Sequence, residues 1–359
     1  MCIRDSVNGD GNLDVGEPSG ISVADDPLTT TIDESGSYVI DDVAAGDYSV
    51  VVLPPPGWSL TNPTTRTGGS GNLTIVEVFK DNAGGTDYLD EAAGVTESPD
   101  GNFVYVASYN DDSVTVFARD AATGELSLVQ QVVNGLGGVS GLIGAQSIAI
   151  TTDGQHLYVA SAIDDALVMF HRDVAAGTLT YLGHLKDGVG GVDGLNEAVS
   201  VQVSDDGKHL YVAAFSDGSA AVFARDETSG LVTFTQKVTG NTAQAFAVEL
   251  SPDQRHVYVS ASSSAVTVYD RDPASGVLTL RQTIRNSDPG VSGLLGAAGA
   301  SLSPDGEHLY VAGRSSQGVA VLDRDRSTGE LSFVQFVPDP FPTSNPYPIS
   351  VLVSPDGHH

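Results

Sequence analysis

One ten-residue motif indicates the fold of this 359-residue chain, because close variants of it recur along the sequence. A representative copy is Ser303-Pro304-Asp305-Gly306-Glu307-His308-Leu309-Tyr310-Val311-Ala312. The Ser-Pro-Asp-Gly part suits a type I turn, with Pro at the second place and Gly at the fourth. The residues that follow have the composition of a strand. The aspartates of the six turns stand at positions 100, 153, 206, 253, 305 and 356. A unit of about 50 residues therefore repeats along the chain.

Each repeat predicts four strands. The turn is followed by a strand such as 103–106, and a polar link leads to a second strand that ends in Arg-Asp, as at 119–120. A glycine such as Gly124 closes a hairpin into a third strand, and a last strand such as 145–150 leads into the next turn. Four strands in about 50 residues are typical of a β-propeller blade. We therefore predict an all-β fold with an incomplete β-propeller over residues 92–359, made of five blades plus one strand.

The motifs SPDGxHLYVA and RDxxTGxL in residues 92–359 resemble those of the lactonase-like seven-bladed propellers, a family that includes many non-catalytic, secreted relatives. The resemblance implies the propeller fold and, in catalytic members, His, Arg and Glu side chains around a central channel. Because five complete repeats are present and the sequence ends within a turn motif, we expect a truncated propeller that lacks two units. A five-bladed ring is the alternative.

The first residues of the chain contain a calcium-loop pattern. Gly11 permits a tight turn, and oxygen-bearing side chains fall at the spacing that Ca²⁺ ligands have in such loops. These candidate metal ligands are Asn8, Asp10, Asn12, Asp14 and Glu17. The sequence predicts a Ca²⁺ site here, and a surface loop rich in Asp, Asn and Gly is the alternative interpretation.

The segment after the loop predicts short strands, at 36–40 and 46–52, followed by a proline-rich break. Residues 7–78 resemble the B-type repeat domains of bacterial cell-wall adhesins, which implies a small calcium-binding β-sandwich that acts as a stalk. No lysine precedes Lys80, so a Lys–Asn isopeptide cross-link within this module is excluded.

These observations predict a division of the chain into four parts. The first six residues, Met1-Cys2-Ile3-Arg4-Asp5-Ser6, resemble the translation of a sequencing adapter and are set aside as an artefact. The remaining parts are a β-sandwich at 7–78, a linker at 79–91 and the propeller at 92–359.

Composition excludes several classes of function. The formal net charge is −30, because 46 acidic residues outnumber 16 basic ones, and such a polyanion repels nucleic acid. We therefore expect no nucleic-acid partner. No apolar run approaches the roughly 18 residues that a membrane helix needs, so no membrane insertion is expected in the visible segment. With 40% hydrophobic residues the chain can still build a core.

The strand before each turn should lie innermost in a propeller, so its side chains should line the hub. The six copies of this strand contain no His, Lys or Arg, and their polar residues include Glu97, Gln202 and Glu249. Such a hub has no evident cation to stabilise an oxyanion and no base beyond an ordinary carboxylate. The repeated His, Tyr and Arg-Asp residues are interpreted as structural, because one copy per blade distributes them around the ring.

The polar links between strands offer a possible binding face. Loops on a rigid scaffold commonly carry function, and these links are acidic, so they suit a cation or a cationic partner. Its residues are Asp111, Asp112, Asp164, Asp165, Asp193 and Asp217. The alternative is a solvated rim without a ligand.

From these patterns we expect a non-enzymatic secreted or cell-surface scaffold or adhesin, in which a calcium-stiffened stalk carries a propeller that binds an unknown protein or glycan. The expected location is extracellular or at the bacterial cell surface. The alternative is a lactonase-type hydrolase resembling 6-phosphogluconolactonase. No catalytic residue is assigned.

Overall fold

A computed structural model describes residues 2–6, 19–21, 49–53, 78–79, 88–240, 243–339 and 347–354. The chain divides into two compact units, 1–71 with 358–359, and 72–357. All regular elements among the described residues are β-strands, which confirms the all-β prediction. Within that part of the chain, no helix has the length and apolarity to cross a lipid bilayer.

The first unit contains a three-stranded antiparallel sheet in the order β2-β1-β3. Its strands are β1 (Cys2–Ser6), β2 (Ser19–Ile21) and β3 (Ser49–Leu53). Cys2–Ser6, five of the six residues set aside as an artefact, thus form the central strand of this sheet. The predicted Ca²⁺ ligands Asn8, Asp10, Asn12, Asp14 and Glu17 lie outside the described residues.

The second unit contains five four-stranded antiparallel sheets, one for each complete repeat, and this confirms the incomplete propeller. Blade 1 consists of β4 (Ala92–Glu97), β5 (Phe103–Ser108), β6 (Ser113–Arg119) and β7 (Leu126–Val133). Blade 2 consists of β8 (Ala145–Ile150), β9 (His156–Ser161), β10 (Ala166–Arg172) and β11 (Leu179–Lys186). Blade 3 consists of β12 (Ala198–Val203), β13 (His209–Ala214), β14 (Ser219–Arg225) and β15 (Val232–Thr239).

The last two blades repeat the pattern. Blade 4 consists of β16 (Ala245–Leu250), β17 (His256–Ala261), β18 (Ala265–Arg271) and β19 (Leu278–Arg285). Blade 5 consists of β20 (Ala297–Leu302), β21 (His308–Gly313), β22 (Gly318–Arg324) and β23 (Leu331–Pro338). Each of the five blades is a simple meander in which neighbours in sequence are neighbours in space.

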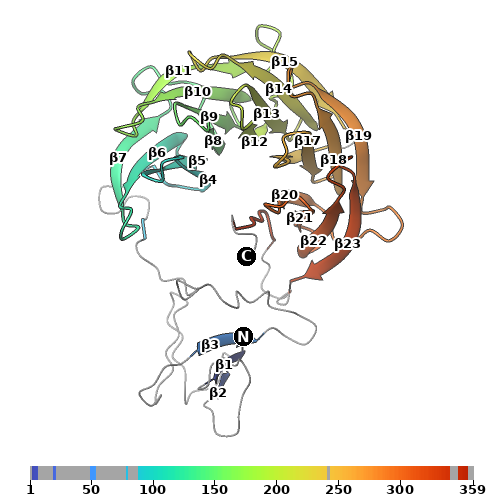
Figure 1. The fold of residues 1–359 in the computed structure, drawn as a ribbon. Helices are drawn as coiled ribbons and strands as arrows, with labels where there is room; N and C mark the ends of the chain where they lie inside the picture. Colours follow the sequence, from blue (N-terminus) through green and yellow to red (C-terminus); the bar gives the residue numbers. More distant parts are fainter. Residues whose placement is uncertain are drawn as a thin grey trace. The chain divides into compact units, whose positions relative to one another are not determined.

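The blades follow one another around an arc in chain order, with the first strand of each blade on the inner side (Figure 1). Successive first strands β4, β8, β12, β16 and β20 contact one another, so they form the hub predicted from the repeat. Every blade has the same irregularity of register in its third strand, for example between Met169 and Phe170. Equal repeats therefore place equivalent residues at equivalent positions around the hub.

Residues 349–353, predicted as the first strand of a further blade, run beside β20 but are not a strand in the structure. The backbone N–H of Gly299 donates to the carbonyl of Ile349 at 2.9 Å, and the N–H of Val353 donates to Ser301 Oγ at 3.2 Å. Among the described residues no second strand pairs with this segment, so it lacks the ladder that defines a strand.

The apolar core lies between the blades. One cluster joins blades 1 and 2 through residues such as Tyr105, Leu157 and Phe170, and three further clusters join the remaining pairs. The two faces of blades 2, 3 and 4 thus pack against different neighbours, which is why the second strand of blade 2 is buried along its whole length.

Candidate functional site

The inner strands bring two polar side chains together at the hub. Gln202 on β12 and Glu249 on β16 occupy the same position in successive blades, and Gln202 Nε2 donates to Glu249 Oε2 at 2.6 Å. The backbone N–H of Leu302 on β20 donates to the other carboxylate oxygen, Oε1, at 3.3 Å. Glu249 is therefore fixed by groups from the blades on both of its sides.

Desolvation by burial raises the pKa of Glu249 to about 7, and the hydrogen bonds from Leu302 and Gln202 only partly oppose this rise. The residue is nonetheless half-buried rather than sealed, so solvent reaches it. A carboxyl group that titrates near neutrality and remains accessible is suited to accept and return a proton. Among the described hub residues, Glu249 is the strongest candidate for general acid–base chemistry.

The amide of Gln202 has a fixed orientation. Its Oε1 accepts from the backbone N–H of Leu250 at 3.1 Å, which leaves Nε2 to face the carboxylate of Glu249. Serines continue this pattern around the hub, because Ser147 Oγ accepts from the N–H of Val201 at 3.1 Å and Ser200 Oγ accepts from Val248 at 3.3 Å. Side chains of one inner strand thus bind the backbone of the next.

Glu249 and Gln202 are recognisable in the sequence as polar hub residues, but no role was predicted for them. Gln146, which lies on β8, is a further polar residue of the inner strands and was not among those named from the sequence. Glu97, the third residue named there, lies at the end of β4 with its Oε1 3.7 Å from Arg119 Nη1, and its side chain is 55% exposed. Glu97 is therefore an exposed ion-pair partner rather than a desolvated hub acid.

The repeated His, Tyr and Arg residues meet between blades, not at the hub. In each of four contacts, which we call blade joints, an Arg from one blade binds a Tyr and the turn Asp of the preceding blade. In three of the four the Arg also contacts a His, whereas in the joint between blades 1 and 2 Phe103 takes the place of the His. Between blades 2 and 3, Arg225 Nε donates to the phenol oxygen of Tyr158 at 2.8 Å, and Arg225 Nη2 lies 2.6 Å from His156 Nδ1. The arginines of the four joints are Arg172, Arg225, Arg271 and Arg324.

Burial sets the protonation of these histidines. Desolvation, reinforced by the charge of Arg225, lowers the pKa of His156 to about 4. Desolvation also lowers the pKa of His209, with the charge of Arg271, and that of His256, with the charge of Arg324. The joint histidines are therefore neutral at pH 7 and accept from arginine. This geometry supports their structural interpretation.

The acidic face predicted from the links is dispersed over three blades, and most of its carboxylates bind backbone N–H groups. Asp112 Oδ1 accepts from Gly144 at 2.8 Å, and Asp165 Oδ1 accepts from Glu197 at 2.8 Å, in each case in the following blade. Asp164 Oδ2 accepts from Ile143 at 2.9 Å, and Asp111 Oδ2 accepts from Asp90 at 2.6 Å. These aspartates stabilise the loops that enter the inner strands.

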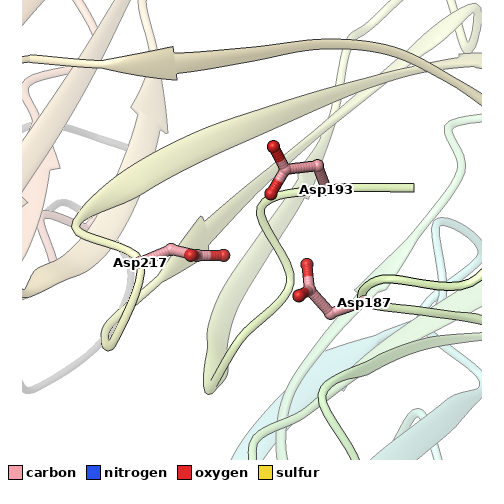
Figure 2. A group of neighbouring side chains, drawn as sticks. All are labelled: Asp187, Asp193 and Asp217. Atoms are coloured by element: carbon pink, nitrogen blue, oxygen red, sulfur yellow. The ribbon is translucent and has the colours of Figure 1, made fainter. Parts of the chain in front are cut away.

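The last two residues of that predicted face, Asp193 and Asp217, gather with Asp187, so that ligand atoms of the three carboxylates lie within 4.8 Å of one another (Figure 2). The ammonium group of Lys237 lies 2.8 Å from Asp193 Oδ1 and 2.9 Å from Asp217 Oδ1. Asp187 Oδ1 accepts from the backbone N–H groups of Gly194 and Leu195. Lys237 thus already supplies the positive charge that this cluster attracts.

Two similar proteins bear on the function of the site. The chain is 23% identical over 277 residues to a 6-phosphogluconolactonase of Klebsiella pneumoniae, covering 66% of this chain and 81% of that protein. It is 24% identical over 287 residues to a 6-phosphogluconolactonase of Enterobacter sp. strain 638, covering 76% and 77%.

Solved structures agree in fold. A candidate 6-phosphogluconolactonase from Bacteroides fragilis matches with a TM-score of 0.59 and 20% identity, covering 74% of this chain and 73% of that one. The periplasmic gluconolactonase PpgL of Pseudomonas aeruginosa matches with a TM-score of 0.57 and 23% identity, covering 68% and 70%. At these identities the likeness concerns the fold alone.

These comparisons correct two expectations. The prediction of a non-enzymatic scaffold or adhesin is wrong, because the similar proteins are named as lactonases. It gave decisive weight to the lack of cations on the inner strands, whereas burial alone gives a hub carboxyl group a pKa suited to catalysis. The predicted extracellular or cell-surface location is likewise not supported, since it followed from the adhesin interpretation and only one of the structures named here is called periplasmic.

The family itself follows from matches that run through all five blades. A family model described as "Lactonase, 7-bladed beta-propeller" matches residues 64–185, 184–292 and 263–359. The matched segments begin before blade 1 and together include every described strand of the second unit. The chain therefore belongs to the lactonase family of seven-bladed β-propellers.

Proposed function

We propose that this protein hydrolyses a lactone at its hub, with Glu249 as the group that moves the proton. The observation that carries this proposal is a hub carboxyl group held by neighbouring blades, with a pKa of about 7. Membership of the lactonase family and the names of the curated relatives support the reaction class.

The chemistry requires one base that later acts as an acid. Ionised Glu249 accepts a proton from water while the water oxygen attacks the lactone carbonyl carbon, which gives a tetrahedral intermediate. When the bond between that carbon and the ring oxygen breaks, protonated Glu249 returns the proton to the ring oxygen. The products are a free hydroxyl group and a carboxylic acid, and Glu249 is ionised again.

Gln202 serves as a positioning residue in this scheme. Its Nε2–H bond holds Glu249 Oε2, and the N–H of Leu302 holds Oε1, so the carboxyl group keeps one orientation through both proton transfers. Removal of the Gln202 amide would free the carboxylate and change its pKa without removing the base.

The substrate class that suits this hub is an uncharged sugar-acid lactone. The inner-strand segments at 92–97, 145–150, 198–203, 245–250, 297–302 and 349–353 contain no Lys, Arg or His. A phosphate group generally requires such cations or a cluster of backbone N–H groups. Of the substrates suggested by the relatives' names, unphosphorylated gluconolactone is therefore the better fit.

The test is hydrolysis of δ-gluconolactone and of 6-phosphogluconolactone by the full chain, measured as acid release above the spontaneous rate. We expect kcat/KM to be higher for the unphosphorylated lactone and to rise with pH through an apparent pKa near 7. Glu249→Gln should lower kcat by about 100-fold or more, the scale of one acid–base group. The control Glu97→Gln, an exposed carboxylate of β4, should retain activity. Hydrolysis that is unchanged by Glu249→Gln would refute the assignment.

A further inference from the structure

A hydrogen bond that recurs around the hub connects a serine of one inner strand to the backbone of the next. Val201 on β12 donates its N–H to Ser147 Oγ on β8 at 3.1 Å, and Val248 on β16 donates to Ser200 Oγ on β12 at 3.3 Å. In both cases the donor is the fourth residue of its inner strand and the acceptor is the third residue of the preceding one. We call this contact the serine cap.

The serine cap is absent between blades 4 and 5. The fourth residue of β20 is Ala300, and the third residue of β16 is Ala247, whose methyl group cannot accept a hydrogen bond. Ala300 pairs with Val311 in the same register in which Val248 pairs with Val259, so its N–H has the equivalent direction. Among the described side chains, none accepts from the N–H of Ala300.

The uncapped N–H is also less covered than its equivalents. Ala300 is half-buried, whereas Val201 and Val248 are only 3% and 2% exposed. Ala247 is half-buried too, and both alanines have less bulk than the residues at the equivalent positions of blade 3. A backbone donor in such a place costs free energy unless an acceptor reaches it. The position therefore suits an acceptor that is not part of the chain.

The N–H of Ala300 lies beside the candidate base. Ala247 and Glu249 are two residues apart on β16, so both side chains point toward β20. Glu249 Oε1 accepts from the N–H of Leu302 at 3.3 Å, and Leu302 follows Ala300 by two residues on the same edge of β20. Residues two apart in a strand are separated by about 6.6 Å. A carbonyl group and one water molecule span the distance between the carboxylate and the free donor.

We propose that the N–H of Ala300 binds the carbonyl oxygen of the lactone and stabilises the negative charge that forms on it. This inference rests on the proposed function, in which Glu249 is the base. The water oxygen bonds to the carbonyl carbon, the water proton passes to Glu249, and the π electron pair moves to the carbonyl oxygen. When the ring C–O bond breaks, that pair forms the C=O bond again, and the ring oxygen takes the proton from Glu249.

A backbone donor of this kind acts on the transition state more than on the bound substrate. The hydrogen bond to the negative oxygen is stronger than the bond to the neutral carbonyl, and the strand fixes the direction of the N–H before the reaction begins. A hub whose described inner strands carry no Lys, Arg or His can therefore still stabilise an oxyanion.

Ala247→Ser tests the donor by restoring the serine cap. We expect the added hydroxyl to accept from Ala300 and to lower kcat for δ-gluconolactone by about 100-fold, the scale of one oxyanion donor. The pH profile should keep its shape, because Glu249 is unchanged. Ala247→Cys is the matched control for size, since sulfur is a weak acceptor, and it should retain most of the activity. Melting curves check that both variants fold, and equal activities of the two variants would overturn the proposal.

Replacement of the Ala300 amide by an ester removes the N–H itself. Incorporation of lactic acid in place of alanine at this position of the full chain keeps the methyl group and exchanges the N–H for an oxygen. We expect kcat to fall by about 100-fold with little change in KM. Full activity of the ester protein would show that this N–H does not touch the reacting oxygen.

Binding of the δ-lactam of gluconic acid, a carbonyl compound that resists hydrolysis, separates this inference from the proposed function. Titrated into the ¹⁵N-labelled full chain, the lactam should move the amide proton resonance of Ala300 downfield, and it should not do so in Ala247→Ser. A shift without any lactone hydrolysis would support the carbonyl site and refute the proposed function. Hydrolysis that depends on Glu249, with no shift at Ala300, would refute the carbonyl site alone.

Discussion

Arg225 of blade 3 and Tyr158 of blade 2 are joined by a 2.8 Å hydrogen bond across the interface between two sheets, although they lie 67 positions apart in the sequence. The same phenol donates its proton to the carbonyl of Gly230 at 2.8 Å. One hydroxyl therefore links a charged side chain and a hairpin backbone of the following blade, and neither has water as a substitute in this buried position.

Removal of this hydroxyl should destabilise the propeller. Tyr158→Phe leaves Arg225 Nε and the Gly230 carbonyl each short of a buried partner, and we expect a loss of about 1–3 kcal/mol in the free energy of unfolding. Urea denaturation measures the change. Tyr310→Phe is the matched control, because the hydroxyl of Tyr310 has no such bond among the described residues and should change stability by less than about 0.5 kcal/mol. Equal effects of the two variants would contradict the role of the joint.

The hairpin glycine of the joint should be nearly irreplaceable. Gly230 has a φ of +72°, and an added Cβ would collide with the imidazole of His156. Gly230→Ala should therefore cost more than Gly124→Ala, since Gly124 has a similar φ of +77° but no neighbour within 4 Å. Because both variants carry the same backbone strain, the difference in their melting temperatures isolates the contact. If the two melt together, His156 does not restrict the position.

Stability should fall as the pH is lowered from about 6.5 to about 4. The folded-state pKa of His156 lies at about 4, below its ordinary value of 6.5, and the pKa values of His209 and His256 are also lowered. Between these limits the unfolded chain binds more protons than the folded one, so protonation favours unfolding. The contribution of these neutral histidines to stability is fully present above pH 6.5. Chemical denaturation at a series of pH values measures it, and replacement of His156 by Gln should flatten the profile.

Glu249 should give a pH dependence of the opposite sign. Its pKa is raised from 4.5 to about 7, so its contribution is fully present below pH 4.5 and is lost as the pH rises through 7. Glu249→Gln removes the cost of an ionised, desolvated carboxylate, and it should therefore raise the melting temperature at pH 8 relative to the unchanged protein while lowering the rate of hydrolysis. At pH 5 the two proteins should melt alike. A variant that is less stable at pH 8 would contradict the raised pKa.

The calcium loop remains a prediction from sequence, with Asn8, Asp10, Asn12, Asp14 and Glu17 as its ligands. Isothermal titration of the full chain with CaCl₂ should show binding that Asp10→Ala abolishes, because hard cations of this size require several carboxylate and carbonyl oxygens. The matched control is Asp47→Ala, an acidic residue of the same segment outside the loop pattern. The absence of a binding heat at millimolar Ca²⁺ would contradict the predicted Ca²⁺ site.

The blades could be predicted from sequence because their determinants are local. The Ser-Pro-Asp-Gly turns hold as expected: in the first, the N–H of Gly101 donates to the carbonyl of Ser98 at 2.8 Å. Gln254 takes the glycine position in the fourth turn with a φ of +59°. Turn type and strand pattern are encoded within about ten consecutive residues, so single-sequence reasoning reaches them.

The joints and the candidate site could not be predicted in the same way, because they depend on distant segments. The repeated Arg, Tyr and His each have a visible period, but nothing in that period indicates that Arg225 of one repeat meets Tyr158 of the preceding repeat. Glu249 is an ordinary glutamate in sequence, and its raised pKa arises from the strands that desolvate it. From sequence alone Asp165 is expected to be an ordinary surface carboxylate. In the structure its Oδ1 accepts a hydrogen bond from the backbone N–H of Glu197, 32 residues away.

Because every joint pairs an arginine with the tyrosine and turn aspartate of the preceding blade, addition or removal of one whole repeat by recombination would leave matching surfaces at the new junction. A duplication of about 50 residues would bring its own arginine and its own acceptors, and it would need no compensating substitution elsewhere. Insertion or deletion of only a few residues would not preserve these matching surfaces. We therefore expect the number of blades to change in whole units, with hub residues such as Glu249 limiting which changes preserve the site.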